Sequence, residues 1–402
     1  MAFDLLITNA RTRKQNGELV CIGIQDGKIV AIEPNLPVEA GHMIDAGGGL
    51  VTESFVNGHL HLCKVYTLEM AGQAALGEYH HGGMGGAMTA IERAADFKAA
   101  YNEEWILPNV RRACDLALHY GNTHIRAFAD VDSKARLEGI KALLKARTEY
   151  ADRVELQVVA FPQDGVVREP EAEGYVVQAI EMGADVVGGI PWIEYIKADE
   201  QNHIDKMFDI AVKYNKDVSM LLDDVGDESE KTLEMLALRA HKEGWQGRVT
   251  AQHCRAMALY GENYFRKLVA LMKRAGIGLV ADPHTGPLHA RVRELAAAGI
   301  PVALGQDDIA DAYYPFGRCN MLEIAFLASH LMWMTSFADM EFLYDMITTS
   351  AAKVLGIRGH VLEVGGNADL VVLEAKDIYH AIWEHQAPLH VIKNGKEVTI
   401  PR

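Results

Sequence analysis

The sequence lacks an excess of positive charge. Its 402 residues include 39 Lys and Arg against 55 Asp and Glu, which gives a formal net charge of −16. A surface that binds nucleic acid needs a clustered positive field, because phosphate contacts supply much of the affinity. We therefore expect no nucleic-acid partner, and the same argument disfavours an anionic membrane surface.

Three other features are absent. No run of about 20 apolar residues indicates a transmembrane helix, and the start Met1-Ala2-Phe3-Asp4 lacks the basic segment and long apolar run of a signal peptide. The five cysteines are odd in number and contain no Cys-x-x-Cys pair, so they indicate reduced thiols instead of a disulfide frame. These absences predict a cytoplasmic protein without a membrane partner.

Short strand patterns fill both ends of the chain. They cover residues 4–9, 20–25 and 28–32 near the start, and residues 368–373, 390–393 and 396–400 near the end. The dipeptides Asp26-Gly27 and Asn394-Gly395 are typical of tight turns between paired strands. We therefore expect a small β-sandwich domain built from residues 1–50 together with 358–402.

Strand and helix patterns alternate in the middle of the chain. The expected strands are residues 50–56, 124–130, 155–161, 185–190, 217–222, 248–253, 278–282 and 301–305, with helical periodicity between them, as at 204–214 and 231–243. Eight such units predict an α/β fold with a (β/α)8 TIM barrel over residues 51–357. The glycines at 82–86 lack the Lys-Ser/Thr of a phosphate loop, so we expect a flexible loop there.

Polar residues follow several of the expected strands. His59 and His61 come at the end of the first strand, and side chains at i and i+2 of a strand point to the same face. Gln163, His253 and Asp307 follow later strands. Chemistry in such barrels gathers at the carboxyl ends of the strands. A metal site that combines His59, His61 and Asp307 is therefore the first hypothesis about function.

Several segments carry a more specific signal. They are Leu156–Gly165, Gly183–Pro191, Gly247–His253, and Gly305–Ile309 followed by Tyr313–Gly317. Together with the His-x-His pair, they resemble the amidohydrolase superfamily over nearly the whole chain, and most closely its cytosine deaminase and N-isopropylammelide hydrolase branch. The resemblance implies a hydrolase of a non-peptide C–N bond in a cyclic amidine or amide, with a nitrogen heterocycle as small-molecule substrate.

The resemblance also implies roles for individual residues. His59, His61 and Asp307 match the ligands of one divalent metal ion, which we expect to be zinc, iron or manganese. Such an ion lowers the pKa of bound water from about 16 to near 7, and the metal-bound hydroxide attacks the substrate. Asp307 also matches the catalytic aspartate, and His253 the catalytic histidine that polarises or protonates the substrate. Gln163 matches a residue that binds the heterocycle, whereas Asp308 and Tyr313 match residues that line the pocket.

Two strands depart from the pattern of the family. The fifth strand of the family ends in a metal-binding histidine, followed three residues later by a proton-carrying glutamate. Here these positions hold Leu221, which cannot bind a metal, and Asp224, whose carboxyl group is retracted by about 1.5 Å. On the second strand, Phe128 replaces a histidine. We expect Asp224 to remain catalytic, as the proton carrier, and the substrate to be more apolar than cytosine.

Alternatives remain open at this stage. The fourth metal ligand could come from His253, Asp224 or Cys63, whereas Lys64 is rejected as a carbamylated bridging ligand. The enzyme could instead be an amide or carbamate hydrolase that releases no ammonia. A catalytically silent protein that only binds a ligand is the competing interpretation from another class. The apolar segment 321–334 could pack between subunits of a homo-oligomer.

Overall fold

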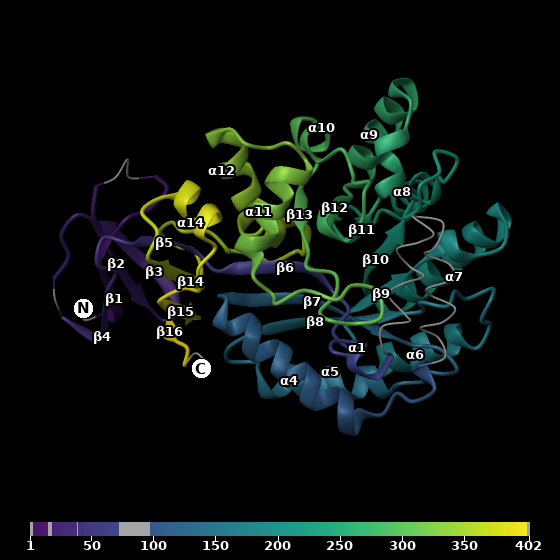
Figure 1. Cartoon of the computed structure of the whole chain (residues 1–402), viewed down its shortest axis with the longest axis horizontal. Helices are drawn as coiled ribbons and strands as arrows, with labels where there is room; N and C mark the ends of the chain where they lie inside the picture. The colour runs from purple at the N-terminus through teal and green to yellow at the C-terminus, as the bar shows by residue number, and fades with distance from the viewer. Residues whose placement is uncertain (1–2, 15–17, 38, 72–96, 400–402) are drawn as a thin grey trace.

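The computed structural model describes residues 3–14, 18–37, 39–71 and 97–399. A small unit of strands from both ends of the chain lies beside a larger unit of strands and helices (Figure 1). The loop expected at residues 82–86 lies outside the described residues. Within the described ranges, no helix is both long and apolar enough to cross a membrane.

Eight parallel strands form the centre of the larger unit, and each pairs with the next one in sequence order. They are β6 (Phe55–Leu60), β7 (Asn122–Asp130), β8 (Glu155–Phe161), β9 (Val186–Gly189), β10 (Asp217–Leu222), β11 (Val249–His253), β12 (Gly278–Ala281) and β13 (Val302–Leu304). A parallel bridge between Leu60 and Asp307 joins the first edge of the sheet to the segment after the last strand. The predicted (β/α)8 barrel is confirmed.

Helices lie around the outside of this barrel (Figure 1). They are α1 (Leu68–Ala71), α4 (Glu103–His119), α5 (Glu138–Glu149), α6 (Ala172–Met182), α7 (Lys197–Tyr214), α8 (Thr232–Glu243), α9 (Glu262–Ala275), α10 (Val292–Ala297), α11 (Met321–Leu331), α12 (Phe337–Asp345) and α13 (Thr349–Val354). Helix α9 illustrates the pattern: it buries Phe265, Leu268, Met272 and Ala275, spaced three or four residues apart on one face. It ends where Gly276 adopts a φ of +63°.

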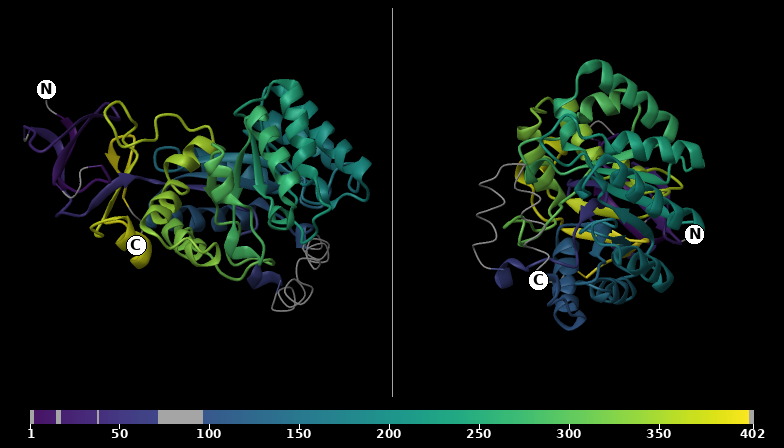
Figure 2. Two further views of the ribbon diagram at one scale, coloured as in Figure 1. Left: turned by 90° about the horizontal axis from the view of Figure 1, so that it is seen from above. Right: turned by 90° about the vertical axis from the view of Figure 1, so that its right-hand side faces the viewer.

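The small unit contains two four-stranded sheets, with the strand orders β3-β2-β1-β4 and β16-β15-β14-β5. The strands are β1 (Phe3–Ala10), β2 (Val20–Gln25), β3 (Lys28–Glu33), β4 (Ala40–Asp45), β5 (Leu50–Glu53), β14 (Leu370–Leu373), β15 (His390–Lys393) and β16 (Lys396–Glu397), and α14 (Ile378–Glu384) lies between β14 and β15. Leu5, Ile22, Val51 and Leu370 belong to one buried apolar cluster. The two sheets therefore share a core, as expected for a sandwich of strands from both termini (Figure 2).

The expected strand at residues 50–56 is wrong. Two strands occupy this stretch: β5 pairs with β14 of the small unit, whereas β6 pairs with β7 of the barrel. Ser54 lies between them and donates its backbone N–H to the Asp369 carbonyl oxygen over 2.9 Å. Both strands are fully buried, so their sequences form one apolar run that hides the change of sheet.

A buried arginine, Arg126, lies at the middle of β7. Arg126 is 2% exposed, and its Nη1 donates to Thr250 Oγ1 over 2.8 Å. Its Nη2 donates to Gln157 Oε1, also over 2.8 Å. These partners come from neighbouring and opposite strands, so a polar plug fills this part of the barrel. The polar side chains discussed below lie at the carboxyl end of the strands.

Candidate active site

Seven of the eight predicted site residues line one cavity of about 50 Å³ at the carboxyl ends of the barrel strands. These seven are His61, Gln163, Asp224, His253, Asp307, Asp308 and Tyr313. The eighth, His59, is fully buried, and its Nε2 atom lies 3.2 Å from Asp307 Oδ1. The structure therefore brings the predicted set together from five different strands and their loops.

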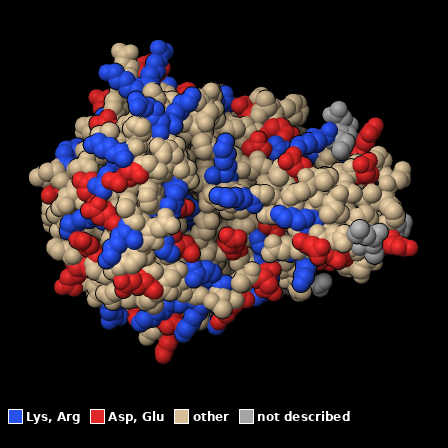
Figure 3. Space-filling model, turned by 180° about the vertical axis from the view of Figure 1, so that it is seen from behind, with Lys and Arg blue, Asp and Glu red and all other residues tan. Residues whose placement is uncertain are grey.

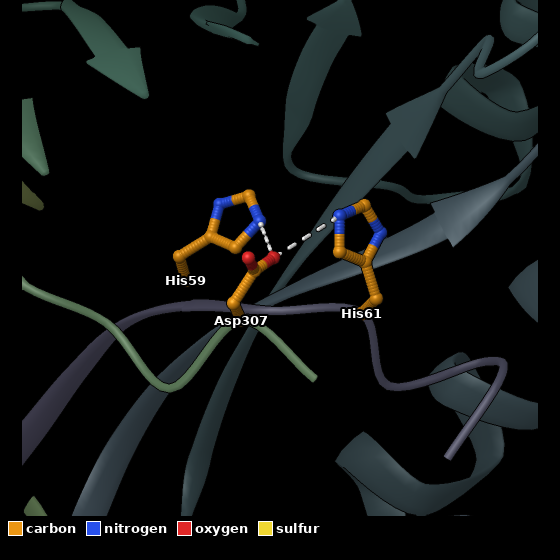
Figure 4. A group of neighbouring side chains, drawn as sticks. All are labelled: His59, His61 and Asp307. Atoms are coloured by element: carbon orange, nitrogen blue, oxygen red, sulfur yellow. Dashed lines mark ion pairs between the residues drawn. The ribbon is translucent and has the colours of Figure 1, made fainter. Parts of the chain in front are cut away.

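His59, His61 and Asp307 converge on one point (Figure 4). Asp307 Oδ1 lies 3.2 Å from His59 Nε2 and 3.7 Å from His61 Nε2. The backbone fixes this arrangement, because His61 N–H donates to the Asp307 carbonyl oxygen over 2.8 Å. Burial, with the charges of Lys64 and His59, holds the pKa of His61 well below its usual value.

These residues fit a divalent cation. The Gln252 amide nitrogen donates to Ser219 Oγ over 2.9 Å, so its oxygen accepts from His59 Nδ1–H over 3.1 Å. The lone pair of His59 is then on Nε2, a buried atom without a hydrogen-bond partner in the described part of the chain. It faces the carboxylate of Asp307, so two electron-pair donors confront each other. A metal ion between such donors resolves this conflict, and an outer partner such as Gln252 fixes the tautomer of the ligand.

His253 joins this group from β11. Its Nε2 atom lies 3.8 Å from Asp307 Oδ1, and its ring centre is 4.9 Å from that of His59. Its other nitrogen, Nδ1, lies 3.5 Å from Asp282 Oδ2 at the end of β12. Burial holds the pKa of His253 well below its usual value, so the ring is neutral and one nitrogen keeps a lone pair.

Asp224 lies just past β10 and pairs with a buried arginine. The Arg255 Nη1 atom is 3.0 Å from Asp224 Oδ1, and Nη2 is 3.7 Å from Asp307 Oδ2. Thr285 Oγ1 donates to the same Asp307 oxygen over 2.9 Å and accepts a hydrogen bond from Arg255. Burial raises the pKa of Asp224 to about 7, against the opposing charge of Arg255. A carboxyl group of this kind can accept and donate protons at neutral pH.

Gln163 and Tyr313 form a polar wall with Lys64. The Lys64 ammonium donates to Gln163 Oε1 over 3.0 Å and lies 4.3 Å from the centre of the Tyr313 ring. Gln163 Nε2 donates to the Tyr313 hydroxyl over 3.3 Å. Asp308 lines the same side of the cavity. Burial, with the charges of Asp307 and Asp311, raises the pKa of Asp308 well above its usual value, so this carboxyl group can donate a hydrogen bond.

Apolar side chains form the rest of the wall. Leu221 belongs to a buried cluster with Phe128, Phe161 and Trp192, and Leu221 and Trp192 line the cavity. The Phe128 ring lies 4.2 Å from that of His59. Leu221 and Phe128, the two positions that depart from the expected pattern, therefore meet in one apolar surface beside His59, His61 and Asp307.

Sequence reasoning missed several residues of this site. Gln252, Arg255, Asp282 and Thr285 were not singled out, and Lys64 was considered only as a bridging ligand. Asp282 carried a usable signal, because it ends the seventh strand as Asp307 follows the eighth. Cys63, a proposed fourth ligand, instead accepts the Asp130 N–H over 3.3 Å.

Comparisons with known proteins found similar sequences and structures. The model of the amidohydrolase family matches residues 42–399. The chain is 30% identical to the N-isopropylammelide isopropyl amidohydrolase of Pseudomonas sp. (strain ADP), over 98% of this chain and 96% of that protein. It is 27% identical to the pterin deaminase of Rhizobium rhizogenes, over 94% and 87%. A solved structure of the 5-methylcytosine deaminase of Klebsiella pneumoniae with 5-fluorocytosine matches with a TM-score of 0.89 and 31% identity, over 99% of this chain and 98% of that one.

Proposed function

Because the chain belongs to the amidohydrolase family, we propose that it is a metal-dependent hydrolase that breaks a non-peptide C–N bond in a nitrogen heterocycle and releases ammonia or an amine. One observation carries the proposal. Three imidazole Nε2 atoms lie within 3.8 Å of the same oxygen of Asp307, in a site lined by the carboxyl group of Asp224. This combines a metal-ligating group with a group that can carry protons.

The cofactor that we propose is one divalent ion, zinc, iron or manganese, held by His59, His61 and Asp307. When bound, such an ion lowers the pKa of a coordinated water molecule from about 16 to near 7. Asp307 is the base: its Oδ2 atom is held by Thr285 and faces Arg255, so the carboxylate keeps a fixed orientation beside the ligands.

Asp224 carries the proton to the leaving group. The water oxygen bonds to the ring carbon, the C–N bond breaks, and the leaving nitrogen takes up a proton that originated in the water. A carrier must lose and regain a proton in each cycle, and the pKa of Asp224, about 7, suits both steps. Arg255, within 3.0 Å, keeps this carboxyl group in place.

The walls of the cavity favour a planar, partly apolar substrate. Gln163, Tyr313 and Asp308 offer hydrogen-bonding groups to the edge of a ring, and Leu221 and Trp192 offer an apolar surface. The relatives named above act on or bind N-isopropylammelide, pterin and 5-fluorocytosine. We propose a heterocycle of the same general kind with a more apolar substituent than cytosine carries.

Metal analysis followed by a substrate screen tests the proposal. Protein purified without chelators or an affinity tag is expected to contain close to one equivalent of zinc, iron or manganese. It is then expected to release ammonia or an amine from a pyrimidine, a triazine or a pterin, whereas His59→Gln protein is not. Ring opening without ammonia would favour an amide or carbamate hydrolase. Protein that neither retains metal nor takes it up on refolding would point to a silent ligand-binding relative.

A further inference from the structure

The metal-ligating group lacks its fifth-strand member, because Leu221 stands at that position. We propose that His253 takes its place as the fourth metal ligand, and that Asp282 is the positioning residue that directs His253 Nε2 to the ion. The inference rests on the proposed metal-dependent function and differs from the family pattern, which gives the sixth-strand histidine to the substrate.

The first support is the common target of the three imidazoles. The Nε2 atoms of His59, His61 and His253 lie 3.2, 3.7 and 3.8 Å from Asp307 Oδ1. The ring of His253 is as close to that of His59, at 4.9 Å, as the ring of His61 is, at 4.8 Å. His253 therefore approaches the same oxygen of Asp307 as the two predicted ligands do, and three histidines with one carboxylate would make a four-ligand set.

The second support is the unusual state of Asp282. Its side chain is completely buried, and in the described part of the chain neither carboxyl oxygen has a hydrogen-bond partner. His253 Nδ1 also lacks one, and it lies 3.5 Å from Asp282 Oδ2. A buried carboxylate without donors is costly. An N–H on His253 Nδ1 that points to Asp282 would satisfy both groups and leave the lone pair on Nε2, as in the carboxylate–histidine–metal arrangement.

The backbone around these residues makes room for the arrangement. A side-chain carbon added at Gly305 would lie 2.3 Å from Asp282 Oδ1 and 2.6 Å from His59 Cβ. Only glycine at this position therefore leaves room for the Asp282 carboxylate and His59 on either side of it. His253 itself has a φ of +63°, followed by Cys254 at +54°. Such left-handed conformations cost on the order of 1 kcal/mol for ordinary residues and persist where the surroundings enforce them. Here they turn His253 towards the centre of the barrel mouth.

The other two candidates for the fourth ligand are engaged elsewhere. Asp224 pairs with Arg255 over 3.0 Å, and Cys63 Sγ accepts the Asp130 N–H. Within the described ranges, neither belongs to a group of ligand atoms that lie within 4.8 Å of one another, whereas His253 and Asp282 form such a group with His59.

Two measurements test the inference. X-ray absorption spectroscopy of the zinc-loaded wild-type protein counts imidazole ligands, and we expect three. Zinc dissociation constants, measured by competition with a chromophoric chelator, are expected to rise about 10- to 100-fold in Asp282→Asn. Asp308→Asn removes a buried carboxyl group that lines the cavity, and it is the control, with unchanged zinc affinity. In a His253→Gln background, adding Leu221→His is expected to lower the zinc dissociation constant at least tenfold.

A count of two imidazole ligands per zinc in the wild-type protein would overturn the inference, and so would an unchanged zinc affinity in Asp282→Asn. Either result would leave the proposed function intact. Wild-type protein that binds no metal would instead overturn the proposed function. Thermal unfolding of each variant separates loss of the site from loss of the fold, and the wild-type spectrum requires no variant.

Discussion

The burial of the Asp224 carboxyl group favours proton transfer but lowers the stability of the folded protein at neutral pH. Burial raises the pKa of this group to about 7, which suits proton transfer at neutral pH. The same burial destabilises the folded protein, because an aspartate in the unfolded chain ionises near pH 4. The folded state therefore binds a proton that the unfolded state releases, and the stability of the protein falls as the pH rises from about 4 to about 7.

Replacing Asp224 by asparagine is therefore expected to separate function from stability. Asp224→Asn is expected to lower kcat by about 100-fold or more, with metal content unchanged. At pH 8, its melting temperature should exceed that of the wild type. Its free energy of unfolding at this pH should be higher by about 2–4 kcal/mol. The difference should shrink towards pH 5, where the wild-type carboxyl is protonated. Calorimetry at both pH values checks this, with the exposed acid of the same loop, Asp227→Asn, as the control. Parallel melting curves for wild type and Asp224→Asn at all pH values would contradict it.

The main residues of the site could be predicted because they lie at or just after strand ends in a regular pattern. His59, His61, His253 and Asp307 belong to this class. Arg255 and Gln252 could not, since their importance depends on partners from other strands: Arg255 contacts Asp224 and Thr285, and Gln252 contacts His59. A sequence shows which residues follow a strand, but not which of them face each other across the barrel mouth.

Two neighbouring loops of the barrel are held together by one buried carboxylate, Glu194, and its hydrogen-bonded partner His203. Glu194, after β9, accepts the N–H groups of Val166 and Arg168, in the loop after β8, over 2.7 and 2.9 Å. His203 of α7 donates from Nδ1 to Glu194 over 2.8 Å and accepts the Ile190 N–H on its other nitrogen over 3.1 Å. These loops carry Gln163 and Trp192 of the cavity, so the pair sets the shape of the substrate wall.

Glu194→Gln is expected to loosen this wall without affecting the metal. The amide can accept at only one of its two termini, so at least one buried N–H loses its partner. The free energy of unfolding should fall by about 1–3 kcal/mol. KM should rise while metal content stays at the wild-type value. Urea denaturation and steady-state kinetics measure the two effects, and Glu228→Gln, an exposed acid, is the control. A lower metal content in Glu194→Gln would show that the loops also support the ligands.

Strand positions could be predicted where turn residues separate the elements. Residues 155–161 and 217–222 match β8 and β10 to the residue. The boundary between β5 and β6 could not, because every residue of both strands is buried and no turn residue marks Ser54. In such a run, the choice of sheet depends on distant partners, here β14 and β7.

At the scale of the whole molecule, a buried cluster of charges joins the small unit to the barrel. Lys393 of β15 donates to Asp369 over 2.9 Å and lies 3.0 Å from Nε2 of His124 on β7. His124 and Asp369, with His360, form a further group with metal-ligating geometry. The ammonium of Lys393 already supplies the cation there, so we expect one metal ion per chain. On the surface, both signs of charge are interspersed over the face in Figure 3.

Lys393→Met is expected to test this connection. The substitution leaves the carboxylate of Asp369 buried without its charged partner, which should lower the free energy of unfolding by about 3–5 kcal/mol. Metal content per chain and kcat at 25 °C should stay unchanged, because the cluster lies away from the cavity. Denaturation and elemental analysis check both, with the exposed Lys396→Met of the same hairpin as control. Two equivalents of metal in the wild type would contradict our account of the cluster.

Three expectations remain predictions at this scale. They are the boundaries of the terminal domain near residues 50 and 358, the cytoplasmic location, and the homo-oligomer. Trp333, Phe337 and Trp383 are 82%, 75% and 55% exposed, and they are the side chains that a subunit contact would cover first. The mass of the particle in solution tests the last expectation.

The pairing of β5 with β14 also orders events during biosynthesis. β5 leaves the ribosome before any barrel strand, yet its partner emerges only after all eight have been made. The edge of β5 that pairs with β14 therefore stays unpaired while the barrel strands are synthesised. Unpaired edges of this kind are sites of misassociation in slowly completed folds. A nascent chain stalled before residue 370 lacks β14 and would therefore expose the edge of β5 that β14 covers in the folded protein. We expect chaperones to bind the chain at this edge.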